Sequence, residues 1–161
     1  MAMMRLARRL CSTSSFVQRA RESRSCEALL GAFKSNGSFD KCLEAAEMQV
    51  TSIGVEGVTC ELTVTAEVCN NFKTLHGGAT STLVDVVGTL ALLGRDPTRP
   101  GVSVEMNQSF CAAAKEGQKL QAVGKVVKYG KTLGFTEVTV ASASDPAKVI
   151  ATGRHTKFLA V

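Results

Sequence analysis

The chain contains 161 residues, of which 45% are hydrophobic and 20% are charged, and its formal net charge is +5 at pH 7. This length and composition predict one globular domain that can bury a core without disulfide or metal support. The longest apolar run, residues 83–93, contains Asp85 and is too short to cross a bilayer, so the sequence predicts no membrane-spanning segment.

The positive charge is concentrated at the N-terminus. Residues 1–24 contain six arginines and one acidic residue, whereas residues 25–161 contain 13 basic and 13 acidic residues. A nucleic-acid-binding protein usually carries its basic residues on the folded surface, and single strands are usually bound by aromatic side chains. The neutral folded part, in a chain with one tyrosine and no tryptophan, therefore predicts that nucleic acid is not a partner.

Residues 1–24 are rich in arginine and serine and nearly free of acidic residues, which is typical of a mitochondrial transit peptide. We therefore expect a protein of the mitochondrial matrix whose folded domain comprises residues 25–161. The alternative is a disordered basic tail on a cytoplasmic protein.

The six cysteines show no Cys-x-x-Cys pair and no metal-ligand spacing with the two histidines, His76 and His155. We interpret them as reduced, small apolar residues and predict no metal site.

Two strands are predicted before the most apolar part of the chain. Residues 27–33 are a helix candidate, and residues 39–47 are expected to form another helical turn or a lead-in to the first strand. Residues 55–68 alternate between apolar and polar side chains, which predicts a half-buried strand. Residues 48–53 are its expected antiparallel partner.

A very apolar helix is predicted at residues 78–93, after a loop, and Gly94 is expected to end it. Four further strands are predicted, separated by short turns. They comprise residues 102–110, 119–128, 132–142 and 149–158. In the third of them the apolar residues change from odd to even positions, which predicts a bulge near Thr136.

A helix that is hydrophobic around most of its circumference must be covered by a sheet. The element order therefore predicts an α+β fold in which a long central helix is wrapped by an antiparallel sheet of about six strands. Asp85 lies near the middle of this helix, where a carboxylate is unfavourable unless it is paired or used. Small and polar residues share its face and would let a ligand, a backbone or a second copy of the helix approach. These residues are Gly78, Ser81, Thr82, Gly88, Thr89 and Leu92.

The helix start, His76-Gly77-Gly78, offers backbone N–H groups that suit the oxyanion formed when a carbonyl is attacked. Asp85 can activate a water or attack as a nucleophile. About 12 Å of helix separates Gly77 from Asp85, so one carbonyl cannot contact both in one chain. If both serve one substrate, two helices must run antiparallel in a site formed by two subunits.

Each of these residues also has a purely structural interpretation. A Gly-Gly helix start is commonly a turn or packing device, and a lone aspartate commonly faces water or caps a helix. A histidine such as His76 is equally typical of a satisfied position in a core.

The combined pattern of Asn70, His76-Gly77-Gly78 and Asp85 is more specific than any of its residues. It resembles the hotdog-fold acyl-coenzyme A thioesterases over about residues 45–159. The segments that carry the resemblance are residues 70–93, 101–107, 130–133 and 153–157. The resemblance implies the hotdog fold, in which dimers pair their sheets and two dimers form a homotetramer.

The resemblance also implies roles for the residues of the site. Gly77 would supply a backbone N–H to the thioester carbonyl, and Asn70 would help to bind and polarise it. Asn71, the next residue in the sequence, is the alternative to Asn70 for this role. His76 is expected beside the reacting groups, where it would orient the site or the substrate.

Water activation is implied for two further residues. Asp85 of the partner chain would activate the water that attacks the thioester, and Ser103 would assist it. The catalytic site would then be shared between subunits.

The resemblance places coenzyme A against the segment after Asn107, the turn at residues 128–133 and one residue near the C-terminus. The expected contacts are Lys115, Lys128, Tyr129, Gly130, Lys131, Thr132 and Lys157. Lysines on loops or strand ends suit the phosphates of coenzyme A, although any one of them is also typical of a solvated sheet edge. Coenzyme A is then part of the substrate, and no separate cofactor is expected.

Together these features imply hydrolysis of medium- to long-chain fatty acyl-coenzyme A to the free acid and coenzyme A. The alternative is a non-catalytic acyl-coenzyme A-binding regulatory protein, because fold does not determine function. Asp85 and Asn70 favour the enzyme, since a binding protein needs no carboxylate near the thioester. A hotdog dehydratase or hydratase would usually have a different arrangement of histidine and acid.

Overall fold

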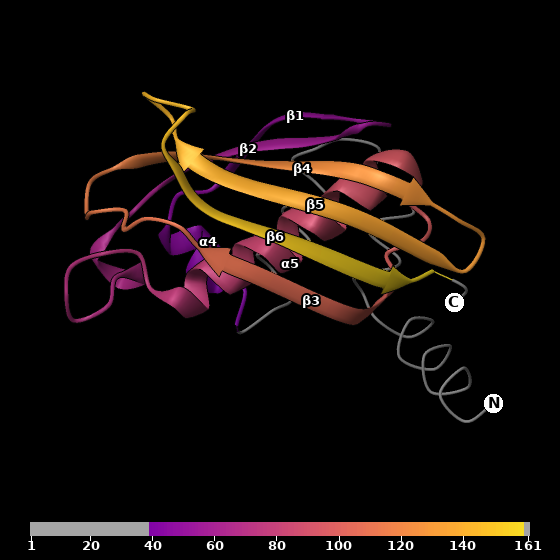
Figure 1. The fold of residues 1–161 in the computed structure, drawn as a ribbon, viewed down its shortest axis with the longest axis horizontal. Coiled ribbons are helices and arrows are strands. Elements are labelled where there is room, and N and C mark those ends of the chain that lie inside the picture. Colours follow the sequence, from indigo (N-terminus) through magenta and orange to yellow (C-terminus); the bar gives the residue numbers. More distant parts are fainter. Residues whose placement is uncertain (1–38, 160–161) are drawn as a thin grey trace.

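One long helix lies across one face of a six-stranded antiparallel sheet (Figure 1). This computed structural model describes residues 39–159. In chain order the elements are α4 (Lys41–Ala45), β1 (Gln49–Gly54), β2 (Gly57–Thr63), the 3₁₀ helix η1 (Ala66–Val68), α5 (Gly77–Arg95), β3 (Val102–Phe110), β4 (Lys119–Tyr129), β5 (Leu133–Ser142) and β6 (Val149–Phe158). The predicted α+β architecture is confirmed.

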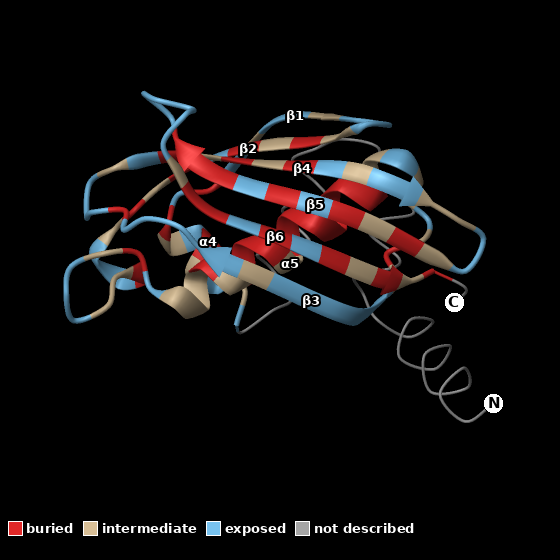
Figure 2. Ribbon diagram, viewed as in Figure 1, coloured by how far each residue is buried: buried red, intermediate tan, exposed pale blue. Residues whose placement is uncertain are grey.

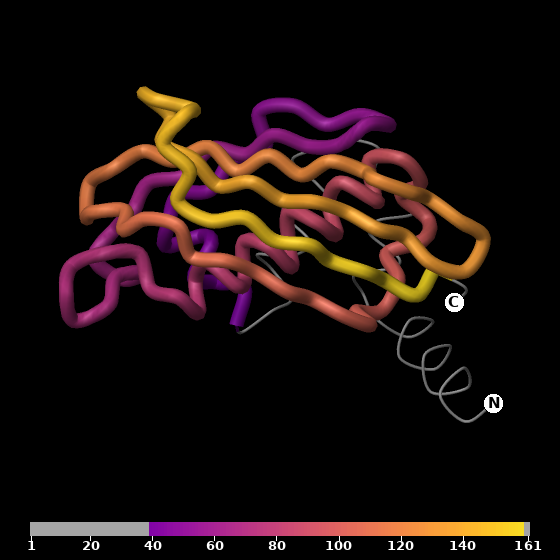
Figure 3. The backbone as a smooth tube through the Cα atoms, in the orientation of Figure 1, coloured from indigo at the N-terminus to yellow at the C-terminus, as the bar shows by residue number. Residues whose placement is uncertain are grey.

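The strands are arranged in the order β1-β2-β4-β5-β6-β3, and every neighbouring pair is antiparallel. The long central strands β4, β5 and β6 run side by side along the length of the molecule (Figure 3). Strand β3 directly follows α5 in the chain but pairs only with β6, so it forms one edge of the sheet. This order brings residues of β3 and β6 together beneath the middle of α5.

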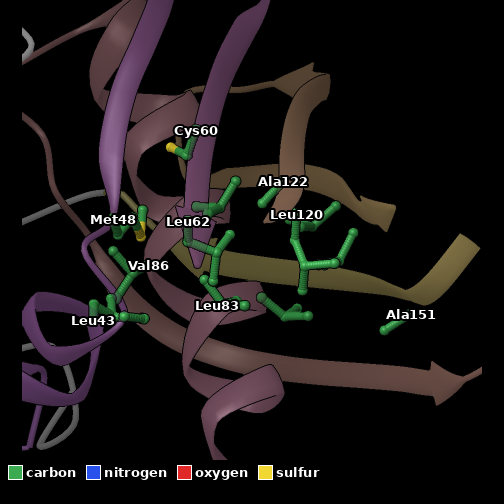
Figure 4. Packing of buried hydrophobic residues seen from close by; sticks show 14 of the residues in the cluster. Leu43, Met48, Cys60, Leu62, Leu83, Val86, Leu120, Ala122 and Ala151 are labelled. Atoms are coloured by element: carbon green, nitrogen blue, oxygen red, sulfur yellow. The ribbon is translucent and has the colours of Figure 1, made fainter. Parts of the chain in front are cut away.

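The core lies between α5 and the inner face of the sheet (Figure 2). Twelve of the 19 residues of α5 are buried, and the buried residues of the strands alternate, as expected for a sheet with one covered face. Leu43 of α4 joins the same cluster, packed near Met48 and Val86 (Figure 4). Although α5 is long and apolar enough to cross a bilayer, 67% of its most apolar window is buried inside the protein, as in a core helix.

The strand predicted over residues 55–68 is too long. β2 ends at Thr63, and the N–H of Val68 donates to Thr65 O in the turn η1. The alternation continues beyond β2 because Val64 and Val68 remain buried after the backbone has left the sheet.

The helix end predicted at Gly94 is also wrong, since α5 continues to Arg95. Gly94 instead lets the helix approach the β1–β2 turn, because a Cβ atom at this position would lie 2.6 Å from Gly54 O. The irregularity predicted near Thr136 belongs to the neighbouring strand: β5 is regular there, and β4 holds the extra residue between Val126 and Lys128. The helix candidate at residues 27–33 and the transit peptide at residues 1–24 lie outside the described residues.

Candidate active site

The start of α5 is capped by the histidine that precedes it. His76 is the N-cap, and its Nδ1 atom accepts a hydrogen bond of 2.8 Å from the Gly78 N–H. As the first helical residue, Gly77 has an N–H with no acceptor inside the helix. The exposed His76 side chain therefore has a structural role, and the Gly77 N–H is the donor directed out of the helix start.

Asn70 organises the loop before the helix. Its Oδ1 atom accepts hydrogen bonds from the N–H groups of Phe72 and Thr74 at 2.9 and 3.2 Å, and its Nδ2 atom donates to Thr74 Oγ1 at 2.9 Å. Asn70 and Gly77 line the same pocket, of about 370 Å³, together with Phe110, Ala112 and other residues. The structure thus brings together the two residues that were predicted to contact a carbonyl.

Asp85 lies two turns further along α5 and does not line that pocket. Its side chain is 48% exposed, in a helix whose neighbouring residues are almost all buried. Its Oδ1 atom is 3.6 Å from Nε2 of His155, a fully buried residue of β6. Within one chain, the Asp85 carboxylate therefore lies apart from Asn70 and Gly77, the two residues expected to contact a carbonyl.

His155 is held by two hydrogen bonds. Its Nδ1 atom is 3.2 Å from the backbone carbonyl of Asp85, and its Nε2 atom is 2.8 Å from Ser103 Oγ on β3. Burial, and next the charge of Lys157, lower the pKa of His155, while Asp85 and Glu105 oppose this shift. The imidazole is therefore neutral at neutral pH, and its contact with the Asp85 carboxylate is not an ion pair.

The neutral state determines the direction of both hydrogen bonds. A carbonyl can only accept, so Nδ1 carries the proton and donates to Asp85 O; Nε2 then accepts from the Ser103 hydroxyl. With its own hydrogen directed to His155, Ser103 Oγ presents lone pairs. Asp85 and Ser103 are consequently two hydrogen-bond acceptors that both lie close to Nε2 of His155.

Lys157, an expected contact of coenzyme A, is not available to a ligand as a surface cation. Lys157 is only 6% exposed, and its Nζ atom donates to Thr89 Oγ1 at 2.8 Å. Thr89 Oγ1 in turn donates to Asp85 O at 2.8 Å. Lys157 faces α5 because it lies on the inward side of β6, like His155, so it supports the backbone of the helix from beneath.

Part of the stripe of small and polar residues on α5 faces the sheet of the same chain. A Cβ atom on Gly88 would lie 2.8 Å from Thr136 Oγ1 and 3.1 Å from the Cβ atom of His155. Ser81 accepts a hydrogen bond from Gln108 of β3. Glycine at position 88 therefore allows β6 to bring His155 close to the helix.

The residues predicted to bind coenzyme A fall at two ends of the molecule. Lys115 pairs with Thr74 beside the Asn70 loop, near the start of α5. Residues 128–132 form the end of β4 and the β4–β5 turn, near the last turn of α5 (Figure 1). A helix of 19 residues is about 28 Å long, so one chain does not gather all of these residues in one place.

His155 is the site residue that sequence reasoning did not assign. The structure places His155 on the inward side of β6, which it shares with Gly153 and Lys157. A histidine on the face that covers a helix with one carboxylate was the available signal. Among residues 39–159, no group of three histidine, cysteine or acidic side chains could hold a metal ion.

Comparisons with known proteins agree with this geometry. The family model of the thioesterase superfamily matches residues 72–156. Acyl-coenzyme A thioesterase 13 of Mus musculus is 40% identical over 133 residues, which cover 83% of this chain and 92% of the mouse protein. The Homo sapiens protein of the same name is 39% identical over 137 residues, which cover 85% of this chain and 96% of the human protein.

Solved structures give the same result. Zebra fish thioesterase superfamily member 2 superimposes with a TM-score of 0.78 at 36% identity, covering 85% of this chain and 99% of that chain. Thioesterase superfamily member 2 from Mus musculus gives a TM-score of 0.70 at 38% identity, covering 91% of this chain and 99% of that chain. The chain therefore belongs to the thioesterase superfamily of thioester hydrolases.

Proposed function

We propose that this protein hydrolyses acyl-coenzyme A, with a preference for medium- to long-chain fatty acyl groups, to the free acid and coenzyme A. The observation that carries the proposal is the half-exposed Asp85 carboxylate beside the Ser103 hydroxyl, which His155 orients. The relatives named acyl-coenzyme A thioesterase 13 support the substrate class, because the match covers most of both chains.

The two acceptors identified above explain how a water would be oriented. A water that donates one hydrogen to Asp85 and the other to Ser103 directs its lone pairs away from both, towards a bound thioester. Asp85 takes the proton as the water oxygen bonds to the carbonyl carbon. The resulting oxyanion accepts hydrogen bonds from the Gly77 N–H and the Asn70 amide. The C–S bond then breaks, its electron pair leaves with the sulfur, and the proton held by Asp85 restores the thiol of coenzyme A.

We infer that this site is shared between two chains. Gly77 and Asn70 line a pocket that Asp85 does not reach within one chain. An antiparallel partner helix would bring its Asp85 to that pocket. His76, as the cap that fixes the first turn of α5, would hold the Gly77 N–H in position.

The exposed edge of the sheet supports a partner chain. Met106 and Phe110 lie on the inward side of β3, opposite the buried His155 and Ala151, yet they are 41% and 60% exposed. Apolar side chains on an unpaired edge strand are unfavourable in water and are typical of an interface. We propose a dimer formed along this edge, and a tetramer of two such dimers.

Coenzyme A would bind across the same dimer. The exposed Lys115 lies close to the Asn70 loop, whereas the exposed Lys128 and Lys131 lie at the far end of α5. In an antiparallel pair of helices the far end of one chain approaches the start of the other. The phosphates would then be bound by the turn of one chain while the thioester reaches Gly77 of its partner.

The experiment is a thiol-release assay with acyl-coenzyme A substrates of increasing chain length, using the full chain and its Asp85→Asn variant. We expect coenzyme A release by the native protein that requires Asp85, with the highest kcat/KM for medium to long acyl chains. A protein that binds these substrates without releasing thiol would be the non-catalytic alternative, and the proposal would be wrong.

A further inference from the structure

The turn between β4 and β5 is tied to the end of the sheet by backbone hydrogen bonds. The Gly130 N–H donates to Leu133 O at 2.8 Å and closes the turn. The Leu159 N–H, just after β6, donates to Thr132 O at 2.7 Å. Lys131 stands in the sequence between Gly130 and Thr132. Its carbonyl accepts a hydrogen bond from a different part of the chain.

Arg99 provides that contact from the segment that joins α5 to β3. One of its terminal nitrogens, Nη2, donates to Lys131 O at 2.5 Å, and its Nε atom donates to Leu159 O at 3.2 Å. The planar guanidinium can reach two carbonyls at once, which an ammonium on a flexible stem does poorly. Arg99 therefore joins the turn, the end of β6 and the segment after α5.

The same side chain packs on the aromatic ring that begins the turn. The Cζ atoms of Arg99 and Arg95 lie 5.5 and 5.7 Å from the centre of the Tyr129 ring, within the range of cation–π contacts. The Tyr129 hydroxyl is 3.4 Å from Asp96 Oδ2, and the Asp96 charge is further stabilised by hydrogen bonds from Thr98. Both the backbone and the ring of the turn are thus held by the α5–β3 segment.

We propose that Arg99 is a positioning residue for the coenzyme A moiety. Two of its donors are bound to carbonyls, and through these bonds Arg99 holds the turn that displays the exposed Lys128 and Lys131. A turn that is already ordered loses less conformational entropy when its lysines bind phosphate. This inference rests on the proposed function, because it takes residues 128–132 as the site of the nucleotide part of acyl-coenzyme A.

The test compares two thioesters with the same acyl group, acyl-coenzyme A and acyl-pantetheine, which lacks the nucleotide and its phosphates. The variants are Arg99→Lys, which keeps the charge and loses the two-carbonyl contact, and Arg99→Gln. Arg95→Gln is the matched control, since it removes a charge and a contact with Tyr129 but no bond to the turn. Free coenzyme A binding is measured by calorimetry on the same proteins.

For Arg99→Lys we expect KM for acyl-coenzyme A and the Kd of coenzyme A to rise about five- to tenfold, as for the loss of one ordinary hydrogen bond, with kcat unchanged. Turnover of acyl-pantetheine should stay as in the native protein, and Arg95→Gln should change KM less than about twofold on either substrate. A merely structural role would lower both activities together.

Two results would overturn the inference. In the first, Arg99→Lys keeps the native KM, while Arg99→Gln and Arg95→Gln both raise it. This result would show that only the positive charge matters. The other is an equal loss on both thioesters, or no change at all. Failure of the native protein to hydrolyse any acyl-coenzyme A would instead reject the proposed function, and the calorimetry would still test Arg99.

Discussion

The Asp85 carboxylate and the His155 imidazole approach within 3.6 Å, although 70 positions separate them in the sequence. His155 also contacts the backbone carbonyl of the same aspartate, so one buried ring fixes both the helix and the surroundings of its carboxylate. Because burial lowers the pKa of His155, the ring serves as a neutral hydrogen-bonding group. The ring is fully buried and its Nε2 atom is occupied by the Ser103 hydroxyl, so the half-exposed Asp85 carboxylate is the member of this pair that a water can reach.

Replacement of Asp85 by asparagine should lower kcat by about 10²–10⁴-fold, the usual contribution of a general base. The side-chain size is nearly unchanged, and Asp85 is half-exposed, so the protein should remain folded. Asp145→Asn makes the same chemical change in an exposed turn and should keep native turnover. A kcat of Asp85→Asn within about twofold of the native value would contradict the role of Asp85.

The depressed pKa of His155 predicts lower stability in acid. Above the ordinary histidine pKa of about 6.5, the ring is neutral in both the folded and the unfolded chain. As the pH falls below this value, the unfolded chain binds a proton that the buried ring binds less readily, so the free energy of unfolding decreases. Urea unfolding at pH 7.5 and at pH 5.5 would measure this difference.

The decrease in the free energy of unfolding between pH 7.5 and pH 5.5 should be smaller in His155→Gln than in the native protein. His76→Asn removes the other histidine and keeps a residue that favours the N-cap, so it should retain the native dependence. Equal dependence on pH in the native protein and in His155→Gln would show that His155 is not the cause.

Gly88→Ala should lower the free energy of unfolding. The new Cβ atom would approach Thr136 Oγ1 to 2.8 Å, in a place where that hydroxyl already donates to His155 O. Overpacking costs about 1–3 kcal/mol, which exceeds the helix-propensity gain of up to about 1 kcal/mol. Gly54→Ala, with open space around its Cβ position, is the control and should be nearly neutral in urea unfolding. Native stability of Gly88→Ala would mean that α5 and β6 can separate without penalty.

Deletion of residues 1–24 should leave the thioesterase activity of the purified protein unchanged and move the protein from mitochondria to the cytosol. These residues carry the whole net charge and precede the domain that contains the site. Fluorescence microscopy of tagged full-length and shortened chains would measure the location. Mitochondrial residence of the shortened chain would refute the transit peptide.

The fold was predictable because its signals are local. Alternation identifies each long strand, short turns separate them, and the apolar residues of α5 have no cover except a sheet. The predicted ends of β2 and α5 were wrong because the side-chain pattern does not follow the backbone hydrogen bonds there. Val64 and Val68 keep the alternation although the backbone has turned, and Gly94 serves packing at a position where glycine usually ends a helix.

The site was only partly predictable because its contacts are not local. Asn70 and Gly77 are seven positions apart and share a pocket as expected. The contact of Asp85 with His155 depends on β6 lying between β5 and β3, and no local pattern determines that order. Lys157 was misassigned because charge predicts a surface position, whereas the Thr89 hydroxyl gives its ammonium a buried acceptor.

The shared site is tested most directly by mixing two inactive variants, Asn70→Ala and Asp85→Asn. Asn70→Ala lacks a carbonyl-binding group, and Asp85→Asn lacks the base. In a mixed dimer, one of the two sites would combine the native Asn70 of one chain with the native Asp85 of the other. After co-refolding or co-expression, we expect thiol release from acyl-coenzyme A to return to about one quarter of the native rate, since half of the dimers are mixed and half of their sites are intact. Mixed dimers that stay as inactive as the two parent variants would place both residues in a site of one chain and contradict the account.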